Sequence, residues 1–195
     1  MTPFPPAPVP ELWLMRHGET HWNRLGRLQG ALDSPLTRRG REQAAAQARL
    51  LAPVLARPGL RRLSSPQGRA CQTARIVFGA AGFDTDARLS EIGMGDFTGA
   101  FLDDLRRADP ALFGAGGLGW YDRVPGGEHL TPLATRLRGF LAGLTGPAVI
   151  VTHGVTLQVL RLLALGQDLS QLDALAQEQG AVYHIRDRVH RRLPA

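Results

Sequence analysis

The sequence contains no lysine, a single cysteine (Cys71) and only 6% aromatic residues. One cysteine excludes an internal disulfide and any metal site built from several cysteines, and this favours a cytoplasmic protein. All 23 basic side chains other than histidine are arginines, and the formal net charge is +6. A positive charge is compatible with nucleic acid, a membrane surface or small anions as partners. Because the arginines are dispersed along the chain, their charge alone predicts no nucleic-acid partner.

No targeting or membrane-spanning segment is predicted. Residues 1–10 lack the positive start and continuous apolar run of a signal peptide, and their many prolines predict an extended tail. The longest stretch without Asp, Glu, Lys or Arg is 139–160, but a Gly-Pro pair and several polar residues interrupt it. It therefore predicts a helix end, a strand and a new helix rather than a membrane span. We expect residues 11–195 to form one domain, with no membrane as a partner.

Short apolar runs alternate with segments of helical spacing along the chain. The predicted strands are 12–15, 60–64, 148–152 and 181–185, with 189–193 as a candidate partner of the last. The predicted helices are 36–55 with Thr37 as N-cap, 66–78, 98–109 stopped by Pro110, 130–144 and 155–165. The glycine-rich residues 114–127 are predicted to form a long loop or lid. This alternation predicts an α/β fold with a mostly parallel sheet covered by helices on both faces.

Arginine and histidine follow three of the predicted strands. Residues 16–18 (Arg-His-Gly) follow the first strand, Arg69 lies shortly after the second, and His153-Gly154 follows the third. Ligands of such sheets bind outside the carboxyl ends of the strands, so we expect these side chains to meet there. The Gly154 backbone also opens a predicted helix, whose N-terminus attracts anions. The sequence therefore predicts an anion-binding pocket at this edge.

Phosphoryl transfer is the chemistry that such a pocket suits. A neutral imidazole is a competent nucleophile near pH 7, and arginine binds phosphoryl oxygens through two parallel hydrogen bonds. The leaving alcohol needs a proton donor, for which Glu91 is the candidate. No acidic cluster with metal-ligand spacing is present, so no divalent cation is implied.

Six sequence blocks resemble the signature of the histidine phosphatase superfamily, also called the phosphoglycerate mutase-like family. The blocks are 14–23 (LMRHGETHWN), 36–44 (LTRRGREQA), 64–74 (SSPQGRACQTA), 91–99 (EIGMGDFTG), 125–128 (PGGE) and 151–154 (VTHG). An Arg-His-Gly tripeptide alone is weak support, but six blocks in the family's order are specific. The resemblance covers most of the chain and implies a three-layer α/β/α sandwich.

The resemblance also implies a role for each matching residue. His17 is expected to be the nucleophile that becomes phosphohistidine, and Glu91 the general acid and then the base. Arg16, Arg69 and His153 are expected to hold the transferring phosphoryl group. The remaining candidates for substrate contacts are Asn23, Thr20, Gln29 and the backbone of Gly154.

The predicted function is a metal-independent phosphomonoesterase that needs no cofactor, acts on a small phosphate ester and releases inorganic phosphate. The short chain favours the compact phosphatase branch, although Phe97-Thr98 replaces the Trp-Glu of the family pattern. A cofactor-dependent phosphoglycerate mutase and a non-catalytic phospho-ligand binding protein remain alternatives. Trp120-Tyr121 could form part of a lid or a hydrophobic plug, and a homodimer is possible.

Overall fold

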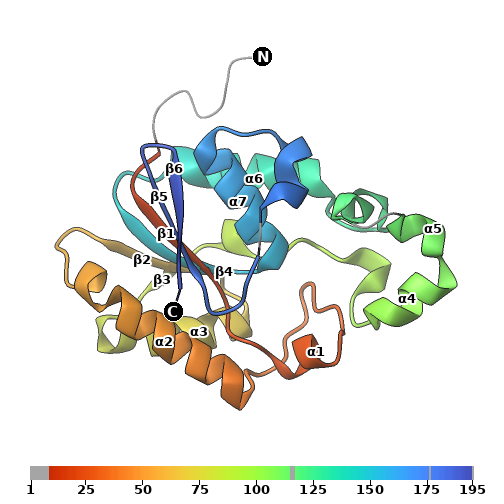
Figure 1. Ribbon diagram of the computed structural model, residues 1–195, viewed down its shortest axis with the longest axis horizontal. Helices are drawn as coiled ribbons and strands as arrows, with labels where there is room; N and C mark the ends of the chain where they lie inside the picture. The colour runs from red at the N-terminus through yellow and green to blue at the C-terminus, as the bar shows by residue number, and fades with distance from the viewer. Residues whose placement is uncertain (1–8, 115–116, 176, 195) are drawn as a thin grey trace.

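A six-stranded sheet forms the centre of the molecule, with helices on both faces (Figure 1). The computed structural model describes residues 9–114, 117–175 and 177–194. The strand order is β3-β2-β4-β1-β5-β6. The strands are β1 (Leu12–Arg16), β2 (Arg61–Ser64), β3 (Asp84–Thr85), β4 (Ala148–Thr152), β5 (Val182–Arg186) and β6 (Val189–Leu193). The four strands from β3 to β1 run parallel, whereas β5 and β6 add an antiparallel edge.

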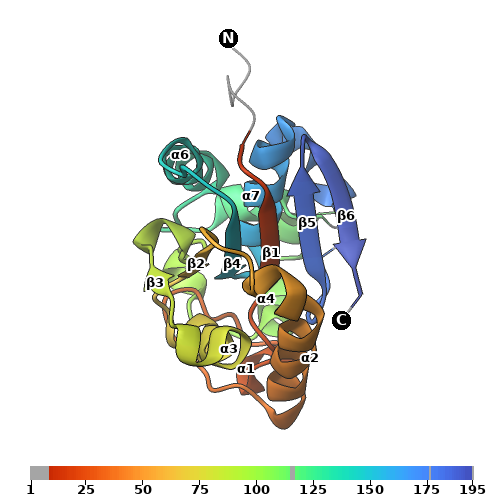
Figure 2. The same cartoon turned by 90° about the vertical axis from the view of Figure 1, so that its left-hand side faces the viewer.

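The α-helices of the described residues are α1 (His21–Arg24), α2 (Arg38–Leu55), α3 (Gly68–Phe78), α4 (Leu102–Ala108), α5 (Pro110–Phe113), α6 (Leu130–Ala142) and α7 (Gly154–Leu165). Four of them cover the faces of the sheet. Helices α2 and α3 lie on one side of the sheet, and α6 and α7 lie on the other (Figures 1 and 2). This arrangement confirms the predicted three-layer α/β/α sandwich.

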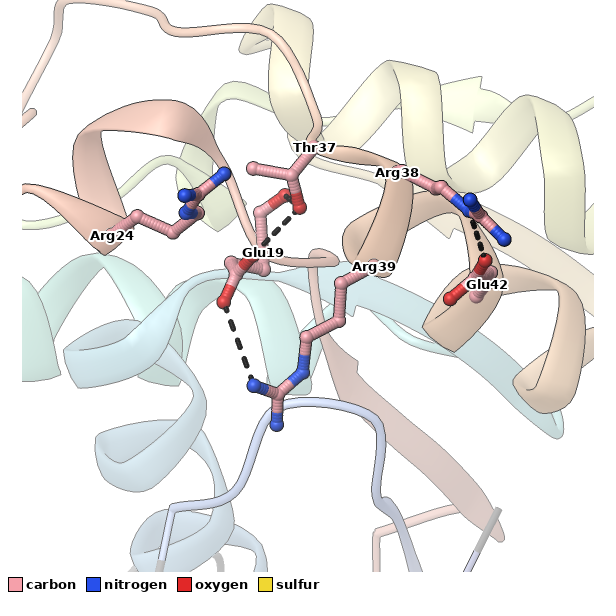
Figure 3. A pocket seen from close by; sticks show the side chains of 6 residues that line it. All are labelled: Glu19, Arg24, Thr37, Arg38, Arg39 and Glu42. Atoms are coloured by element: carbon pink, nitrogen blue, oxygen red, sulfur yellow. Dashed lines mark hydrogen bonds and ion pairs between the residues drawn. The ribbon is translucent and has the colours of Figure 1, made fainter.

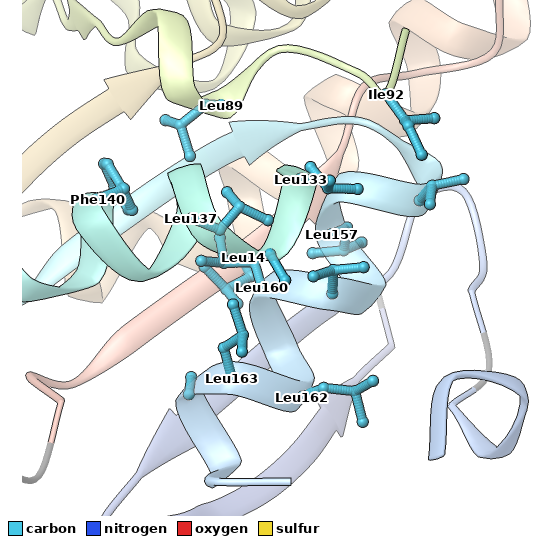
Figure 4. Packing of buried hydrophobic residues seen from close by; sticks show 14 of the residues in the cluster. Leu14, Leu89, Ile92, Leu133, Leu137, Phe140, Leu157, Leu160, Leu162 and Leu163 are labelled. Carbon is cyan, nitrogen blue, oxygen red and sulfur yellow. The ribbon is translucent and has the colours of Figure 1, made fainter. Parts of the chain in front are cut away.

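The alternation of side chains along β1 explains the two layers of core. Leu12 and Leu14 belong to the apolar cluster beneath α6 and α7, whereas Trp13 and Met15 belong to the cluster beneath α2 and α3. Successive strand residues point to opposite faces, so an entirely apolar strand is required where both faces are covered. Figure 4 shows Leu14 beside leucines from α6 and α7 in the larger cluster.

The uncharged stretch 139–160 includes β4 and the first part of α7, which are deeply buried elements. All five residues of β4 are buried, and so are eleven of the twelve residues of α7. The prediction of a helix end, a strand and a new helix is thus confirmed. No helix in the described ranges is long and apolar enough to cross a membrane.

Four local features differ from the sequence prediction. The helix expected over 98–109 is shorter, and Pro110 opens α5 instead of only ending α4. Proline is tolerated at the first position of a helix because its missing N–H would have no helical partner there. The short elements α1 and β3 were not predicted. The segment 114–127 contains a 3₁₀ turn, Gly119–Arg123, while residues 115–116 and most of the proline-rich tail, 1–8, lie outside the described residues.

Candidate active site

Two histidines emerge side by side from adjacent parallel strands. In the register of β1 and β4, Arg16 pairs with Thr152, and the His17 N–H donates to the Thr152 carbonyl at 2.9 Å. The residue that directly follows each of these paired strand ends is a histidine. The ring centroids of His17 and His153 lie 5.2 Å apart. The two residues thus meet at the strand ends, as the sequence predicted.

The hydrogen bonding of His17 determines which ring nitrogen can react. Its Nδ1 lies 2.8 Å from the Gly18 carbonyl oxygen. A carbonyl oxygen only accepts, so Nδ1 carries the proton and Nε2 keeps its lone pair. Burial lowers the pKa of His17 well below its usual value, and the positive charges of Arg16 and Arg69 lower it further. His17 is therefore a neutral imidazole with a free Nε2 at neutral pH.

His153 is fully buried beside His17 and is held by Ser65. Its Nε2 is hydrogen-bonded to the Ser65 hydroxyl at 2.7 Å. Its Nδ1 is buried with no partner among the described residues. Burial, and then the charge of Arg69, lowers the pKa of His153 well below the usual range. This ring is therefore neutral too, and one of its nitrogens has no partner among the described residues.

Arg69 reaches the site from the first turn of α3 and is held by several partners. Its terminal nitrogens donate to the carbonyls of Leu32 at 2.8 Å and Gly30 at 3.0 Å, and to the Asp33 carboxylate at 2.8 Å. Only 1% of Arg69 is exposed. Its Nε, like the Nε of Arg16, is buried without a partner in the described part of the chain. Arg16 and Arg69 thus each have one guanidinium N–H that donates to no described residue.

Glu91 lies against the N-terminus of α7. Its carboxylate accepts hydrogen bonds from the Thr156 N–H and hydroxyl, both at 3.0 Å, and from the Val155 N–H at 3.3 Å. The Glu91 N–H in turn donates to the Gln67 side chain at 2.9 Å. These hydrogen bonds fix the orientation of the Glu91 carboxyl group. Glu91 is partly exposed and faces the same cavity as His17 and Arg16.

One small cavity, about 90 Å³, unites most of the predicted residues. Its lining consists of Arg16, His17, Asn23, Arg27, Leu28, Gln29, Gly30, Arg69, Glu91, Ile92, Met94 and Tyr121. His153 and Gly154 are not part of this lining: the first packs against His17, and the second begins α7. Their predicted contacts with the phosphoryl group stay predictions.

Thr20 is placed outside the cavity lining and has a clear structural role. It is the N-cap of α1, and its hydroxyl accepts from the Asn23 N–H at 3.1 Å. The Asn23 side chain returns the bond by accepting from the Thr20 N–H, which completes a capping box. Asn23 Oδ1 also accepts from Gln179, so its amide nitrogen is the group left to face the cavity. A substrate contact by Thr20 remains a prediction.

Three further residues shape the site without having been predicted to do so. Asp33 accepts from the N–H groups of Gly68 and Arg69 as well as from the Arg69 guanidinium. Arg136 pairs with Glu128 and donates to the Ser90 carbonyl at 2.8 Å. Glu128 also accepts from the Gly93 N–H. These contacts fix Arg69 and the segment before and after Glu91.

A second, open hollow lies at the N-terminus of α2. Contacts around it hold residues 18–19, which follow His17, against this helix. The hollow is lined by Glu19, Arg24, Thr37, Arg38, Arg39 and Glu42 (Figure 3). Glu19 accepts from the Thr37 hydroxyl at 2.7 Å and lies 4.0 Å from Arg39. A Cβ on Gly18 would lie 2.2 Å from the Gly40 carbonyl oxygen, so only glycine permits this approach of the loop to α2.

Comparison with known proteins agrees with this geometry. Residues 12–192 match the sequence model of the histidine phosphatase superfamily (branch 1). The chain belongs to the histidine phosphatase superfamily. The family resemblance and the phosphatase class expected from the sequence are thereby confirmed. In the described ranges of this superfamily member, no three His, Cys, Asp or Glu side chains are grouped so that they could hold a metal ion.

Individual relatives of this histidine phosphatase carry different names. A protein of Serratia proteamaculans (strain 568) named "Probable phosphoglycerate mutase GpmB" is 34% identical over 165 residues, which cover 80% of this chain and 75% of the relative. The α-ribazole phosphatase from Shigella flexneri, known from its crystal structure, is 27% identical in sequence to this chain. The two structures have a TM-score of 0.77, and the match covers 92% of this chain and 93% of that one. TTHB049 from Thermus thermophilus is 36% identical, with a TM-score of 0.70 over 95% of this chain and 99% of that one.

Proposed function

We propose that this protein is a metal-independent phosphomonoesterase that transfers the phosphoryl group of a small ester to His17 and then to water. One observation carries the proposal. One cavity is lined by His17, whose Nε2 keeps its lone pair, and by Arg16 and Arg69, whose buried Nε atoms have no partner among the described residues. A nucleophile beside donors that match phosphoryl oxygens is the arrangement that phosphoryl transfer requires.

In the first step, His17 Nε2 attacks phosphorus while the bond to the leaving oxygen breaks. The guanidinium groups of Arg16 and Arg69 neutralise the charge on the equatorial oxygens. A proton held by Glu91 passes to the leaving oxygen, which departs as the alcohol. We assign the proton of His153 to Nδ1, because a Ser65 hydroxyl that donates to Nε2 leaves Nδ1 as a donor toward the phosphoryl group.

In the second step, water attacks phospho-His17. Glu91, now ionised, takes one proton from this water as the new P–O bond forms and the N–P bond breaks. Inorganic phosphate leaves, His17 is again neutral, and Glu91 is again protonated. His153 stays neutral in both steps. Neither step uses a metal ion.

Phosphate release in the presence of EDTA tests the proposal. We expect EDTA-resistant release from p-nitrophenyl phosphate and from alkyl phosphates, lost in His17→Ala and retained in His21→Ala. His21 is a matched control because it is an exposed histidine four residues away, outside the cavity lining. Release that needs an added metal ion, or that survives in His17→Ala, would contradict the proposal.

A phosphoglycerate mutase is the second candidate, and it is favoured by the name of the Serratia relative. A mutase keeps the phosphorylated product in place and returns the phosphoryl group, so it must exclude water from phospho-His17. Interconversion of 2- and 3-phosphoglycerate by the phosphorylated enzyme, faster than phosphate release from either, would establish the mutase instead.

A further inference from the structure

A single side-chain amide, that of Gln67, joins three segments that line the catalytic cavity. Its Oε1 accepts from the Glu91 N–H at 2.9 Å, and its Nε2 donates to the Gly30 carbonyl at 2.8 Å. The same Oε1 accepts from a terminal nitrogen of Arg69 at 3.4 Å. Gly30, Arg69 and Glu91 belong to the cavity lining, whereas Gln67 does not. Any effect of Gln67 on the reaction must therefore pass through the residues that it holds.

The backbone partners of Gln67 fix the direction in which its amide faces. A backbone N–H only donates, and a backbone carbonyl only accepts. The Glu91 N–H therefore requires the oxygen of the amide, and the Gly30 carbonyl requires its nitrogen. Turning the amide by 180° would place two donors together and two acceptors together. One orientation alone satisfies both segments.

The Gln67 side chain does not start the helix on which it lies. Gln67 is the N-cap residue of α3, but its side chain makes no capping hydrogen bond. The N–H groups of Gly68 and Arg69, which open the helix, donate to the Asp33 carboxylate instead. Loss of the Gln67 amide should therefore leave α3 in place. Its hydrogen bonds serve the surrounding segments rather than its own helix.

Glu91 is held by α6 and α7 as well as by Gln67. Its carboxylate accepts from Thr156 at the start of α7, and Arg136 of α6 donates to the Ser90 carbonyl. Gln67 instead holds the Glu91 N–H from the turn that carries Arg69, two residues further along the chain. Its amide thus links the backbone of the proton donor to the start of the helix that bears the phosphoryl-binding arginine.

We propose that Gln67 is a positioning residue for phosphoryl transfer, which sets the Glu91 carboxyl group relative to Arg69. The proposal rests on the proposed function, because it concerns how the proton of Glu91 reaches the leaving oxygen while Arg69 holds the phosphoryl group. Gln67 itself touches neither the substrate nor His17. Its loss should slow the step that needs the proton more than the same step with a leaving group that needs none.

Gln67→Met removes the amide while keeping the length of the side chain. The measured quantity is the rate of phospho-His17 formation from p-nitrophenyl phosphate divided by the rate from propyl phosphate. We expect this ratio to rise about tenfold, mainly because propyl phosphate reacts more slowly. Unfolded molecules lower both rates equally, so the ratio reports on folded enzyme alone. Gln171→Met, at an exposed glutamine in the 3₁₀ turn Leu169–Ala174, is the matched control and should leave the ratio unchanged.

Gln67→Glu provides the conservative rescue. It keeps an oxygen for the Glu91 N–H and for Arg69, and loses only the donor to Gly30. The Gly30 carbonyl still accepts from Arg69 at 3.0 Å. The ratio should therefore stay within about threefold of wild type. A rise as large as that in Gln67→Met would overturn the proposal, because the acceptor for the Glu91 N–H would then be irrelevant.

A double-mutant cycle with Glu91→Gln separates positioning from general loosening of the site. If Gln67 acts through the Glu91 proton, Gln67→Met should no longer change the ratio once Glu91 is replaced. The same change of ratio in both backgrounds, or an equal loss for the two esters in the single variant, would overturn the proposal.

Binding of orthovanadate gives the same cycle without turnover. Vanadate adopts the five-coordinate geometry of phosphoryl transfer, with an apical oxygen in the place of the leaving oxygen. By calorimetry, Gln67→Met should weaken its binding about fivefold, and within about twofold in the Glu91→Gln background. This result in a protein that turns over no ester would support the positioning role while the proposed function fails. Unchanged vanadate binding in Gln67→Met would overturn the role while the phosphatase stands, and a wild-type protein that neither binds vanadate nor reacts would overturn both.

Discussion

His17 and His153 occupy equivalent positions, each directly after a strand, and their rings lie 5.2 Å apart at an interplanar angle of 60°. Both rings are buried beside arginines, and burial lowers the pKa of each. Two imidazoles this close would repel each other if both were charged. Their shared neutrality leaves Nε2 of His17 as a nucleophile and Nδ1 of His153 free of partners among the described residues.

The same neutrality predicts that the fold loses stability in mild acid. The folded pKa of each histidine is depressed, so below about pH 6.5 the unfolded chain binds protons that the folded chain does not. The free energy of unfolding should therefore fall as the pH drops from 6.5 to 5, by up to about 1.4 kcal/mol per pH unit for each imidazole. Urea denaturation at several pH values measures this slope.

His153→Asn should make that pH dependence shallower by about the contribution of one imidazole. His21→Asn is the control, because this histidine is exposed and the slope should not change. A slope that is identical in wild type and His153→Asn would show that His153 titrates normally in the folded protein.

Glu91→Gln should impair esters according to their leaving groups. If Glu91 protonates the leaving oxygen, loss of that proton should lower the rate of phospho-His17 formation from an alkyl phosphate by about 10²–10⁴-fold. p-Nitrophenolate leaves without protonation, so its release in the first turnover should be much less affected. Rapid-quench measurement of both esters tests this, and an equal loss for the two would remove the acid role.

Asp33 should act on catalysis through Arg69. Asp33→Ala removes the carboxylate that holds the guanidinium at 2.8 Å and leaves Arg69 with its two carbonyl partners. If the Arg69 guanidinium is displaced from its position beside the phosphoryl group, kcat/KM should fall on the order of 10²-fold. Inorganic phosphate should also inhibit the variant more weakly. Steady-state kinetics with phosphate as inhibitor measures both effects. Asp103→Ala, at an exposed ion pair on α4, should change neither constant.

Thr20→Ala should separate helix capping from substrate binding. Loss of the cap of α1 should lower the free energy of unfolding by about 0.5–2 kcal/mol, while Thr20→Ser should retain most of it. KM should stay near the wild-type value in both variants. A large rise in KM in Thr20→Ala without loss of stability would instead favour the substrate contact predicted from the sequence.

The sequence predicted the elements whose signals are local. β4 is a buried run in which residues 149–152 are all β-branched. The apolar spacing of α2 together with Thr37 predicts that helix, and its observed N-cap is Thr37 as expected. The convergence of Arg16, His17 and His153 also followed, because parallel strands bring their ends to one edge.

What the sequence did not reveal depends on contacts between distant segments. Asp33 and Arg69 are 36 residues apart, and Arg136 meets Ser90 across 46 residues. The strand β3 has two residues that gain their conformation from pairing with β2. Tyr121 reaches the cavity because Trp120, beside it, is anchored against Phe113 in the core. No periodicity within a short window specifies these relationships.

Detection of the phosphorylated enzyme tests the central claim most directly. The enzyme is mixed with an alkyl phosphate, quenched in base within milliseconds to seconds, and digested for mass spectrometry, since phosphohistidine survives base but not acid. The account predicts a phosphoryl group on the peptide that contains His17, accumulating in Glu91→Gln when p-nitrophenyl phosphate is the donor and absent in His17→Ala. Turnover with no phosphorylated His17 peptide at any time, or a phosphoryl group that forms equally well in His17→Ala, would contradict it.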